Sequence, residues 1–389
     1  MDYESRLNKT ILEVKPSGIR RFFDIVSDME DVISLSIGEP DFRTPWHVSR
    51  AAIESLEKGR TWYTPNRGFE KLRIEIADFV KRKYELKYAP KTEILVTVGG
   101  SEALDLAMRC LLNPGDEVLI HQPSFVCYEP LTLMTGAVPK IIDTKKENSF
   151  RLTPQELEAA ITDKTKLLIL SYPNNPTGAV MRKADLEALA EVIIKHDLLV
   201  ISDEIYSELT YSGKHVSMGA IEGMRERTVV INGFSKAFAM TGWRLGYAMG
   251  PATIIEMMTK LHQYGIMSAP TVAQYAAIEA LKNGDKDIEK MRGEYEMRRR
   301  YVVGEFNAMG LTCFEPFGAF YSFPCIKSTG LTSEEFCTKL LESKKVAIVP
   351  GNAFGESGEG FVRVSYSYSL KHLREAISRI REFLQELLL

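Results

Sequence analysis

Short apolar runs alternate with amphipathic stretches over most of the chain from about residue 92 onward. The stretches between the runs, such as residues 183–196, space their apolar positions as one face of a helix does. This rhythm predicts an α/β fold with a mostly parallel central sheet sandwiched by helices. The runs that we expect to be strands are residues 94–98, 117–121, 166–171, 198–202 and 228–232.

The pattern changes near residue 290, where long helical stretches precede two further strand-like runs at 318–324 and 359–365. A chain of 389 residues is long for one compact core. We therefore expect residues 45–289 to form a large domain and residues 290–389 a smaller α+β domain. Active sites in parallel sheets lie at the carboxyl ends of the strands, so candidate chemistry is sought there.

Composition and charge exclude several classes of function. Apolar residues make up 45% and charged residues 26% of the chain, as in ordinary globular proteins. The net charge of −3 gives no reason to expect nucleic-acid binding. Three consecutive arginines, 298–300, lie in a helix that also carries glutamates, which predicts a solvated helix face. No apolar stretch approaches the roughly 20 residues of a membrane helix.

The cysteines point to a reducing compartment. They are odd in number and never adopt Cys-x-x-Cys spacing, which favours free thiols over disulfides or a metal site. The charged N-terminus leads into no apolar segment, so no signal peptide is expected. These patterns predict a cytoplasmic protein without a metal centre. The cysteines are Cys110, Cys127, Cys313, Cys325 and Cys337.

Residues 229–247 carry the most informative chemistry. An apolar strand leads into a turn that holds Lys236, and Arg244 follows eight positions later. A desolvated lysine becomes an amine nucleophile, and the planar fork of an arginine grips phosphate. Pyridoxal phosphate offers an aldehyde to the first and a phosphate to the second. A lone lysine after a strand is more often a solvated loop residue, so this prediction depends on the rest of the chain.

A second phosphate signal lies at residues 99–103, where Gly-Gly-Ser-Glu-Ala joins a strand to a helix. Glycines let the backbone approach an anion, and the start of a helix offers free N–H groups and positive partial charge. Ser235, next to Lys236, is a further candidate for binding the phosphate. Ser101 alone is equally well explained as an ordinary helix N-cap.

Further groups suit the pyridine ring of the same cofactor. Asp203 follows a predicted strand, and a buried carboxylate at the ring nitrogen keeps that nitrogen protonated. Tyr206 and Asn175 can hydrogen-bond the phenolic oxygen, and Phe125 can stack on the ring. Each residue alone has a plainer explanation, as an acidic strand end, a turn or core packing. Their joint occurrence in order favours the cofactor site.

Arg363 is the candidate group for a substrate. It alternates with apolar residues in a strand-like run, so its side chain is expected to point inward. A buried arginine needs a carboxylate partner, and a substrate α-carboxylate would accept both arms of its fork. The alternative is a structural ion pair within the protein.

Taken together, these motifs closely resemble those of the class I/II aminotransferases, the fold type I pyridoxal-phosphate enzymes, in the form found in bacteria and archaea. The resemblance covers nearly the whole chain. In the fold that this resemblance implies, the N-terminal segment, residues 1–44, packs with the small domain. The runs that carry it are residues 17–20, 36–42, 63–65, 172–178, 202–206, 229–247, 318–321 and 362–365.

The resemblance implies a role for each matching residue. Lys236 would hold the cofactor covalently and shuttle the proton, Asp203 would contact the ring nitrogen, and Tyr206 would contact the phenolic oxygen. Tyr63 would reach the neighbouring subunit's phosphate, which implies a homodimer with shared sites. The remaining residues divide into Gly100, Ser101, Glu102, Ser235 and Arg244 around the phosphate, Phe125 on the ring, Asn175 on the phenolic oxygen, and Gly38, Asn175 and Arg363 around the substrate carboxylate.

The implied reaction transfers an amino group from an L-amino acid to a 2-oxo acid, which we expect to be 2-oxoglutarate, by a ping-pong mechanism. Strict aspartate enzymes place a second arginine in a stretch that here reads 263–270 and holds no such cation. Some prokaryotic aspartate enzymes carry a lysine where Ser101 stands. The runs 17–20 and 240–246 look most like aromatic and N-acetyl-diaminopimelate aminotransferases, which favours an aromatic or broad-range donor.

Three alternatives stay open. The donor could be aspartate or N-acetyl-diaminopimelate. A carbon–sulfur lyase of the same fold usually carries histidine where Tyr206 stands and departs from the Asn-Asn-Pro-Thr-Gly run. A non-catalytic regulator would need an N-terminal DNA-binding domain, for which we expect no room ahead of Asp41.

Overall fold

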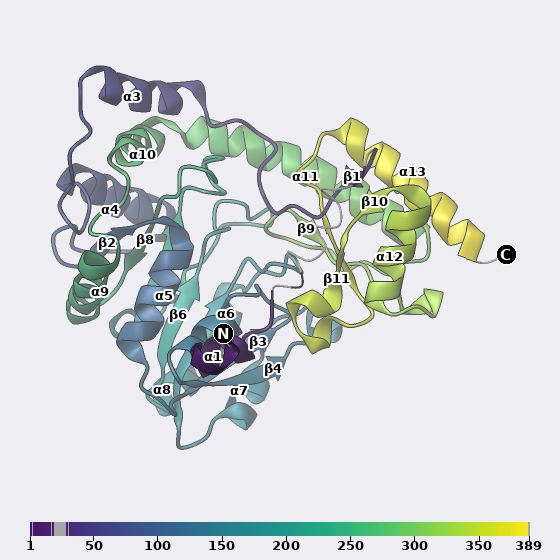
Figure 1. Cartoon of the computed structure of the whole chain (residues 1–389), viewed down its shortest axis with the longest axis horizontal. Coiled ribbons are helices and arrows are strands. Elements are labelled where there is room, and N and C mark those ends of the chain that lie inside the picture. The colour runs from purple at the N-terminus through teal and green to yellow at the C-terminus, as the bar shows by residue number, and fades with distance from the viewer. Residues whose placement is uncertain (2, 17, 19–28, 30, 388–389) are drawn as a thin grey trace.

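A twisted seven-stranded sheet forms the centre of the computed structural model, which describes residues 1, 3–16, 18, 29 and 31–387 (Figure 1). Its strand order is β2-β8-β7-β6-β5-β3-β4. β8 runs antiparallel to β2 and β7, and the other neighbouring strands are parallel, which confirms the predicted α/β fold. The strands are β2 (Ile94–Thr97), β3 (Glu117–Gln122), β4 (Val138–Asp143), β5 (Thr165–Ser171), β6 (Leu199–Asp203), β7 (Thr228–Gly233) and β8 (Gly246–Met249).

The central strands are apolar throughout because both faces of the sheet are buried. In β5, Leu168 and Leu170 pack on one face, while Leu167 and Ile169 pack on the other. One face is covered by α5 (Gly99–Leu111), α6 (Tyr128–Met134) and α9 (Ala252–Gly265). The other is covered by α3 (Trp46–Glu57), α4 (Glu70–Tyr84), α7 (Pro154–Ala160), α8 (Lys183–Lys195) and α10 (Thr271–Asn283).

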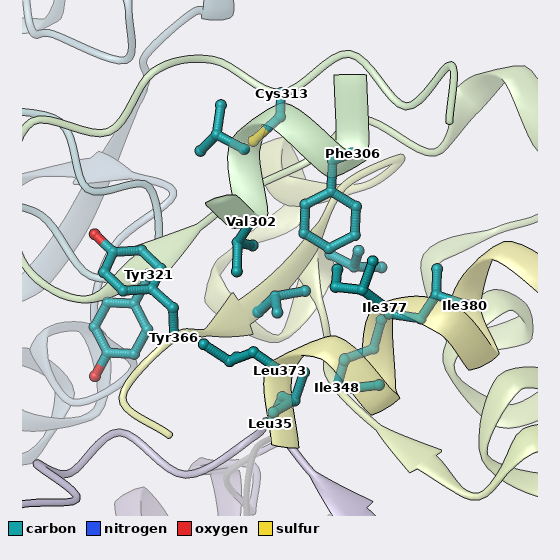
Figure 2. Packing of buried hydrophobic residues seen from close by; sticks show 14 of the residues in the cluster. Leu35, Val302, Phe306, Cys313, Tyr321, Ile348, Tyr366, Leu373, Ile377 and Ile380 are labelled. Atoms are coloured by element: carbon teal, nitrogen blue, oxygen red, sulfur yellow. The ribbon is translucent and has the colours of Figure 1, made fainter. Parts of the chain in front are cut away.

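A second core lies beside the sheet, around two small sheets (Figure 2). It buries Leu35 from the N-terminal part of the chain against Phe306 and Ile377, which come from two helices. Its elements are β1 (Ile33–Ser34), paired in parallel with β10 (Val346–Ala347), and the antiparallel strands β11 (Val349–Pro350), β12 (Val362–Ser365) and β9 (Tyr321–Ser322). Around them pack α11 (Asp285–Ala308), α12 (Ser333–Lys344) and α13 (Leu370–Leu387).

Short helices complete the described chain. They are α1 (Lys9–Glu13) and the 3-10 helices η1 (Glu4–Arg6), η2 (Lys146–Asn148), η3 (Met218–Ala220), η4 (Arg225–Arg227), η5 (Lys327–Thr329), η6 (Gly351–Phe354) and η7 (Glu356–Gly358). Of the run 17–20, only Gly18 is described, so the predictions that rest on Ser17, Ile19 and Arg20 lie outside the described residues. Among the helices that are described, none is both long and apolar enough to cross a lipid bilayer.

The long helix α11 connects the two cores (Figure 1). Ile288 belongs to the core of the large sheet, whereas Tyr295 and Val302 belong to the second core. We propose that the chain divides into an N-terminal segment 1–44, a large domain 45–289 and a small domain 290–389. The pairing of β1 with β10 supports placing the N-terminal segment with the small domain.

Two predictions about this region were wrong in part. The strands expected at 318–324 and 359–365 extend only over β9 and β12, because Pro324 has no N–H for a ladder and the chain turns at Gly360, where φ is +82°. Of the three arginines at 298–300, Arg300 alone is solvated, with a side chain that is 70% exposed. Arg298 is buried and pairs with Asp41 at 2.8 Å, and Arg299 is buried against Glu315. Asp41 lies 257 positions from Arg298, and Glu315 lies 16 positions from Arg299.

Candidate active site

Lys236 lies in the turn after β7, at the carboxyl end of the central sheet. Its Nζ donates to the backbone carbonyl of Gly38 at 2.5 Å. The same nitrogen lies 5.7 Å from the ring centroid of Tyr206 and 5.7 Å from that of Phe320. Within the described part of the chain, no carboxylate forms an ion pair with it. The lysine is therefore held inside the protein and is not a solvated loop residue.

Burial changes the acidity of this amine. It lowers the pKa of Lys236 to about 8, and the nearby positive charges of Arg363 and Arg244 act in the same direction. The carboxylate of Glu39 acts in the opposite direction and raises that pKa. A lysine with a pKa of about 8 holds a substantial neutral fraction near neutral pH, which a nucleophile and a proton carrier both require.

Asp203, the last residue of β6, is a buried carboxylate with defined partners. Its Oδ2 accepts a hydrogen bond from the hydroxyl of Tyr128 at 2.8 Å, and its Oδ1 accepts from the backbone N–H of Ile205 at 3.2 Å. Burial raises the pKa of Asp203, and the hydrogen bond from Tyr128 lowers it. Phe125 is half-buried and packs edge-on against Tyr128, with ring centroids 6.1 Å apart. The arrangement fits a protonated ring nitrogen at Asp203 with Phe125 nearby.

Arg363, on β12, is a buried cation that is 2% exposed. Its Nη1 donates to Oδ1 of Asn175 at 2.9 Å, its Nη2 donates to the carbonyl of Ser36, and its buried Nε has no partner in the described structure. Its guanidinium carbon lies 4.6 Å from the ring centroid of Tyr321 and 4.8 Å from that of Phe354. No carboxylate in residues 1, 3–16, 18, 29 and 31–387 pairs with it. Among these residues, the structural ion pair considered as an alternative is therefore absent.

A tyrosine pair joins this arginine to the lysine. The hydroxyls of Tyr206 and Tyr321 share a hydrogen bond of 2.8 Å. Burial raises the pKa of Tyr206 well above its usual range, so its hydroxyl keeps its proton for donation. Gly38 packs so closely on Tyr321 that a Cβ at residue 38 would lie 2.3 Å from the tyrosine oxygen, which explains the glycine. The amide nitrogen of Asn175 stays free to donate, since within the described structure only its Oδ1 is bound.

The phosphate signal at residues 99–103 forms the first turn of α5. The helix begins at Gly99, so the interpretation of Ser101 as an N-cap was wrong, and the exposed Ser101 hydroxyl has no partner in the described structure. The backbone amides of this turn precede the first i→i−4 hydrogen bond of the helix. Gly99 has φ +76°, and a Cβ there would lie 2.7 Å from Nη2 of Arg244. The guanidinium therefore lies over an open helix N-terminus.

The remaining predicted residues differ in their surroundings. Ser235, beside Lys236, is a buried residue, and its hydroxyl makes no hydrogen bond within the described residues. The Glu102 carboxylate is already bound, by Val98 N–H at 2.5 Å and by His262 at 2.7 Å, so only its backbone N–H remains for an anion. Tyr63 is 79% exposed and the structure does not bring it to the site of its own chain.

Sequence reasoning missed Tyr128 and gave Tyr321 no role. Both tyrosines are fully buried and lie in apolar surroundings, so along the sequence they look like core residues. Tyr128 lies three positions after Phe125, on the same loop-to-helix segment, which is the only local signal for it. Tyr321 lies in the run 318–321, one of the runs in which the chain resembles the class I/II aminotransferases.

The arrangement fits pyridoxal phosphate. It combines a lysine of lowered pKa, a buried carboxylate, and a helix N-terminus beneath an arginine. It also leaves the hydroxyls of Ser101 and Ser235 without partners in the described structure. Each group matches one part of that cofactor. The lysine matches the aldehyde, the carboxylate matches the ring nitrogen, and the helix N-terminus with the arginine matches the phosphate.

Comparisons with known proteins agree with this arrangement. An aspartate aminotransferase of Pyrococcus abyssi is 48% identical over 376 residues, which cover 96% of this chain and 97% of that protein. The aromatic-amino-acid aminotransferase 2 of Thermococcus litoralis is 45% identical over 376 residues, with 96% and 97% coverage. The crystal structure of an aromatic aminotransferase from Pyrococcus horikoshii superposes with a TM-score of 0.90 at 46% identity, covering 95% of this chain and 99% of that one.

The model of the family described as aminotransferase class I and II matches residues 30–380. Enzymes of this class use pyridoxal 5′-phosphate and act on amino acids and oxo acids. This chain belongs to the class I and II aminotransferases, and it is a pyridoxal-phosphate-dependent enzyme that transfers amino groups.

Proposed function

We propose that this aminotransferase takes aromatic amino acids, or a broad range of L-amino acids that includes them, and passes the amino group to 2-oxoglutarate. The observation that carries the amino-acid part of this proposal is Arg363, a buried cation that no carboxylate balances within the described residues. Leaving such a charge unpaired is costly, whereas a bound α-carboxylate would pair with it. Asn175 lies beside it to share that carboxylate, and the backbone of Gly38 is proposed to complete the set.

The proposed roles at the cofactor follow from each group's chemistry. When bound, the cofactor supplies an electron sink for the α-carbon of the substrate. Lys236 Nζ takes the α-proton and returns it, because its pKa of about 8 lets it do both. The Asp203 carboxylate holds the ring N–H. Tyr206 and the amide of Asn175 donate to the phenolic oxygen, and Phe125 covers the ring. Gly100, Ser101, the Glu102 amide, Ser235 and Arg244 hold the phosphate.

The surroundings of the lysine favour an apolar donor side chain. Residues 37–39 lie over Lys236, since the carbonyl of Gly38 accepts its hydrogen bond. This segment presents the partly exposed Ile37 and the carboxylate of Glu39. A second substrate carboxylate would be repelled by Glu39 and gains nothing from Ile37. Arg244 and Arg363 already serve the phosphate and the α-carboxylate in this proposal.

Two other specificities remain as alternatives. The relative from Pyrococcus abyssi is named an aspartate aminotransferase, and N-acetyl-diaminopimelate would also bring a distant carboxylate. Either donor would require a cation that we have not assigned. A carbon–sulfur lyase of the same fold is a further alternative, and it would release ammonia.

Steady-state kinetics test the donor. With 2-oxoglutarate as acceptor, kcat/KM is compared for phenylalanine, tyrosine, aspartate, alanine and N-acetyl-diaminopimelate. We expect kcat/KM for the aromatic donors to exceed that for aspartate by at least about tenfold. A tenfold ratio corresponds to about 1.4 kcal/mol, which one unfavourable charge contact can account for. A preference for aspartate of the same size would refute the aromatic proposal and leave the aminotransferase assignment intact.

We also propose that the enzyme is a homodimer with shared sites. Tyr63 is too exposed to serve the site of its own chain, and Trp62 and Tyr264 are exposed aromatic residues at 60% and 84%. Large exposed aromatic side chains are typical of interfaces. In this proposal Tyr63 donates its hydroxyl to the phosphate held by the neighbouring subunit.

Complementation between two defective variants tests the shared site. Lys236→Ala and Tyr63→Phe subunits with different tags are coexpressed, and heterodimers are isolated. One site of the heterodimer then combines an intact Lys236 with an intact Tyr63 from the other subunit. We expect about half of the wild-type activity at a low cofactor concentration, at which both homodimeric variants are poorly active. Activity no higher than that of the Tyr63→Phe homodimer would show that the tyrosine is not shared.

A further inference from the structure

A buried pair lies behind the first turn of α5. His262, on α9, is 0% exposed, and its Nδ1 lies 2.7 Å from Oε1 of Glu102. The other oxygen of the same carboxylate, Oε2, accepts the backbone N–H of Val98 at 2.5 Å. The carboxylate thus bridges α9 and the residue that immediately precedes the helix. In this reach-back contact a side chain of the first turns satisfies an amide at the helix start.

The chemistry of the pair fixes which nitrogen of the imidazole carries a proton. An ionised carboxylate only accepts hydrogen bonds, so Nδ1 of His262 is the donor. Nε2 is buried without a partner in the described structure. His262 therefore holds the Glu102 carboxylate through the hydrogen bond from its Nδ1.

This anchoring matters because Glu102 carries a negative charge next to an anion site. The open amides of the first turn attract any nearby anion, including a released Glu102 side chain. Held by His262 and Val98, the carboxylate stays on the far side of the turn. Arg244, placed over Gly99, then faces amides for which the described residues provide no side-chain acceptor other than the anchored Glu102 carboxylate.

We propose that His262 and Glu102 are positioning residues that keep the first turn of α5 rigid and free for the cofactor phosphate. This inference rests on the proposed phosphate role of that turn. The pair touches neither Lys236 nor Asp203 through any hydrogen bond in the described structure. Its effect is therefore confined to the phosphate and spares the aldehyde and the ring.

Binding of two cofactor forms tests the proposal. Pyridoxal phosphate and pyridoxal, which lacks the phosphate, are titrated into apoenzyme, and each dissociation constant is measured by the absorbance of the bound aldehyde. In His262→Leu the donor is lost, and we expect binding of pyridoxal phosphate to weaken about tenfold or more while pyridoxal changes less than about twofold. His262→Asn places an amide N–H near the position of Nδ1 and should restore wild-type binding.

Glu102→Ala is the second variant and should show the same selective loss, so the test stands if His262→Leu does not fold. If the variants weaken the binding of pyridoxal phosphate and of pyridoxal equally, or weaken neither, the proposal is overturned. Ser101→Ala separates failure of the proposed phosphate site from failure of the proposed positioning role. If wild-type enzyme binds both ligands equally and Ser101→Ala changes neither, the phosphate site itself is misplaced. If Ser101→Ala loses phosphate selectivity and the His262 and Glu102 variants keep it, only the positioning role fails.

Discussion

Replacing Lys236 by alanine is expected to lower kcat by at least about 10⁴-fold, because the variant lacks the group that takes and returns the α-proton. Within the part of the chain that the structure describes, the side chain makes one hydrogen bond, to the Gly38 carbonyl, so the fold should survive its loss. The measurements are kcat with phenylalanine and 2-oxoglutarate, and the melting temperature. Lys214→Ala is the matched control, since Lys214 is exposed and unpaired in the described structure. Turnover of Lys236→Ala at the Lys214→Ala level would contradict the mechanism.

The same lysine predicts a pH dependence in the wild-type protein. Its pKa of about 8 lies below the value of roughly 10.4 for a free lysine side chain. The neutral, reactive amine therefore becomes the major form as pH rises through 8, and capture of pyridoxal phosphate by apoenzyme should accelerate and then level off. The lowered pKa also determines how stability changes with pH. Because the folded state binds this proton more weakly than the unfolded state does, its contribution to stability rises between pH 8 and about pH 10.

Arg363→Lys is expected to lower kcat/KM for amino acids by about 100-fold, the low end of the 2–5 kcal/mol associated with truncating a buried charged contact. Lysine keeps the charge, but it lacks the planar fork and the stacking on Tyr321 and Phe354. Phenethylamine, a donor without a carboxylate, separates binding from chemistry, and its slow reaction should be unaffected by the substitution.

Arg300→Lys is the matched control for this prediction, because Arg300 is 70% exposed and, among the described residues, pairs only with Glu296 on the same helix. It should retain wild-type kinetics. If Arg363→Lys slows phenethylamine as much as phenylalanine, the arginine supports the fold of the site and does not bind the carboxylate.

The strands of the central sheet were predictable because burial on both faces makes each an apolar run. Asp203 and the strand before Lys236 were found in this way. β4 was missed because it is an edge strand whose residues are mostly exposed, so it has no such run. β8 begins at the end of the run 229–247, which was interpreted only for the chemistry of Lys236 and Arg244.

The details of the site depend on contacts that no local pattern reveals. Helix α5 starts at Gly99 because its left-handed φ and the reach-back of Glu102 place the first turn earlier than a serine cap would. The hydrogen bond from Tyr128 to Asp203 joins residues 75 positions apart. The pair of Arg298 with Asp41 spans 257 positions. Tertiary partners at these separations decide whether a charged side chain is solvated or buried.

A single-turnover reaction tests the central claim most directly. Enzyme loaded with pyridoxal phosphate is mixed with phenylalanine, and separately with aspartate, in the absence of any oxo acid. The absorbance of the cofactor is followed, and oxo acid and ammonia are assayed. The account predicts rapid conversion by phenylalanine, one equivalent of phenylpyruvate per site, and no ammonia. Conversion by aspartate alone would contradict the proposed donor, and release of ammonia would contradict amino transfer itself.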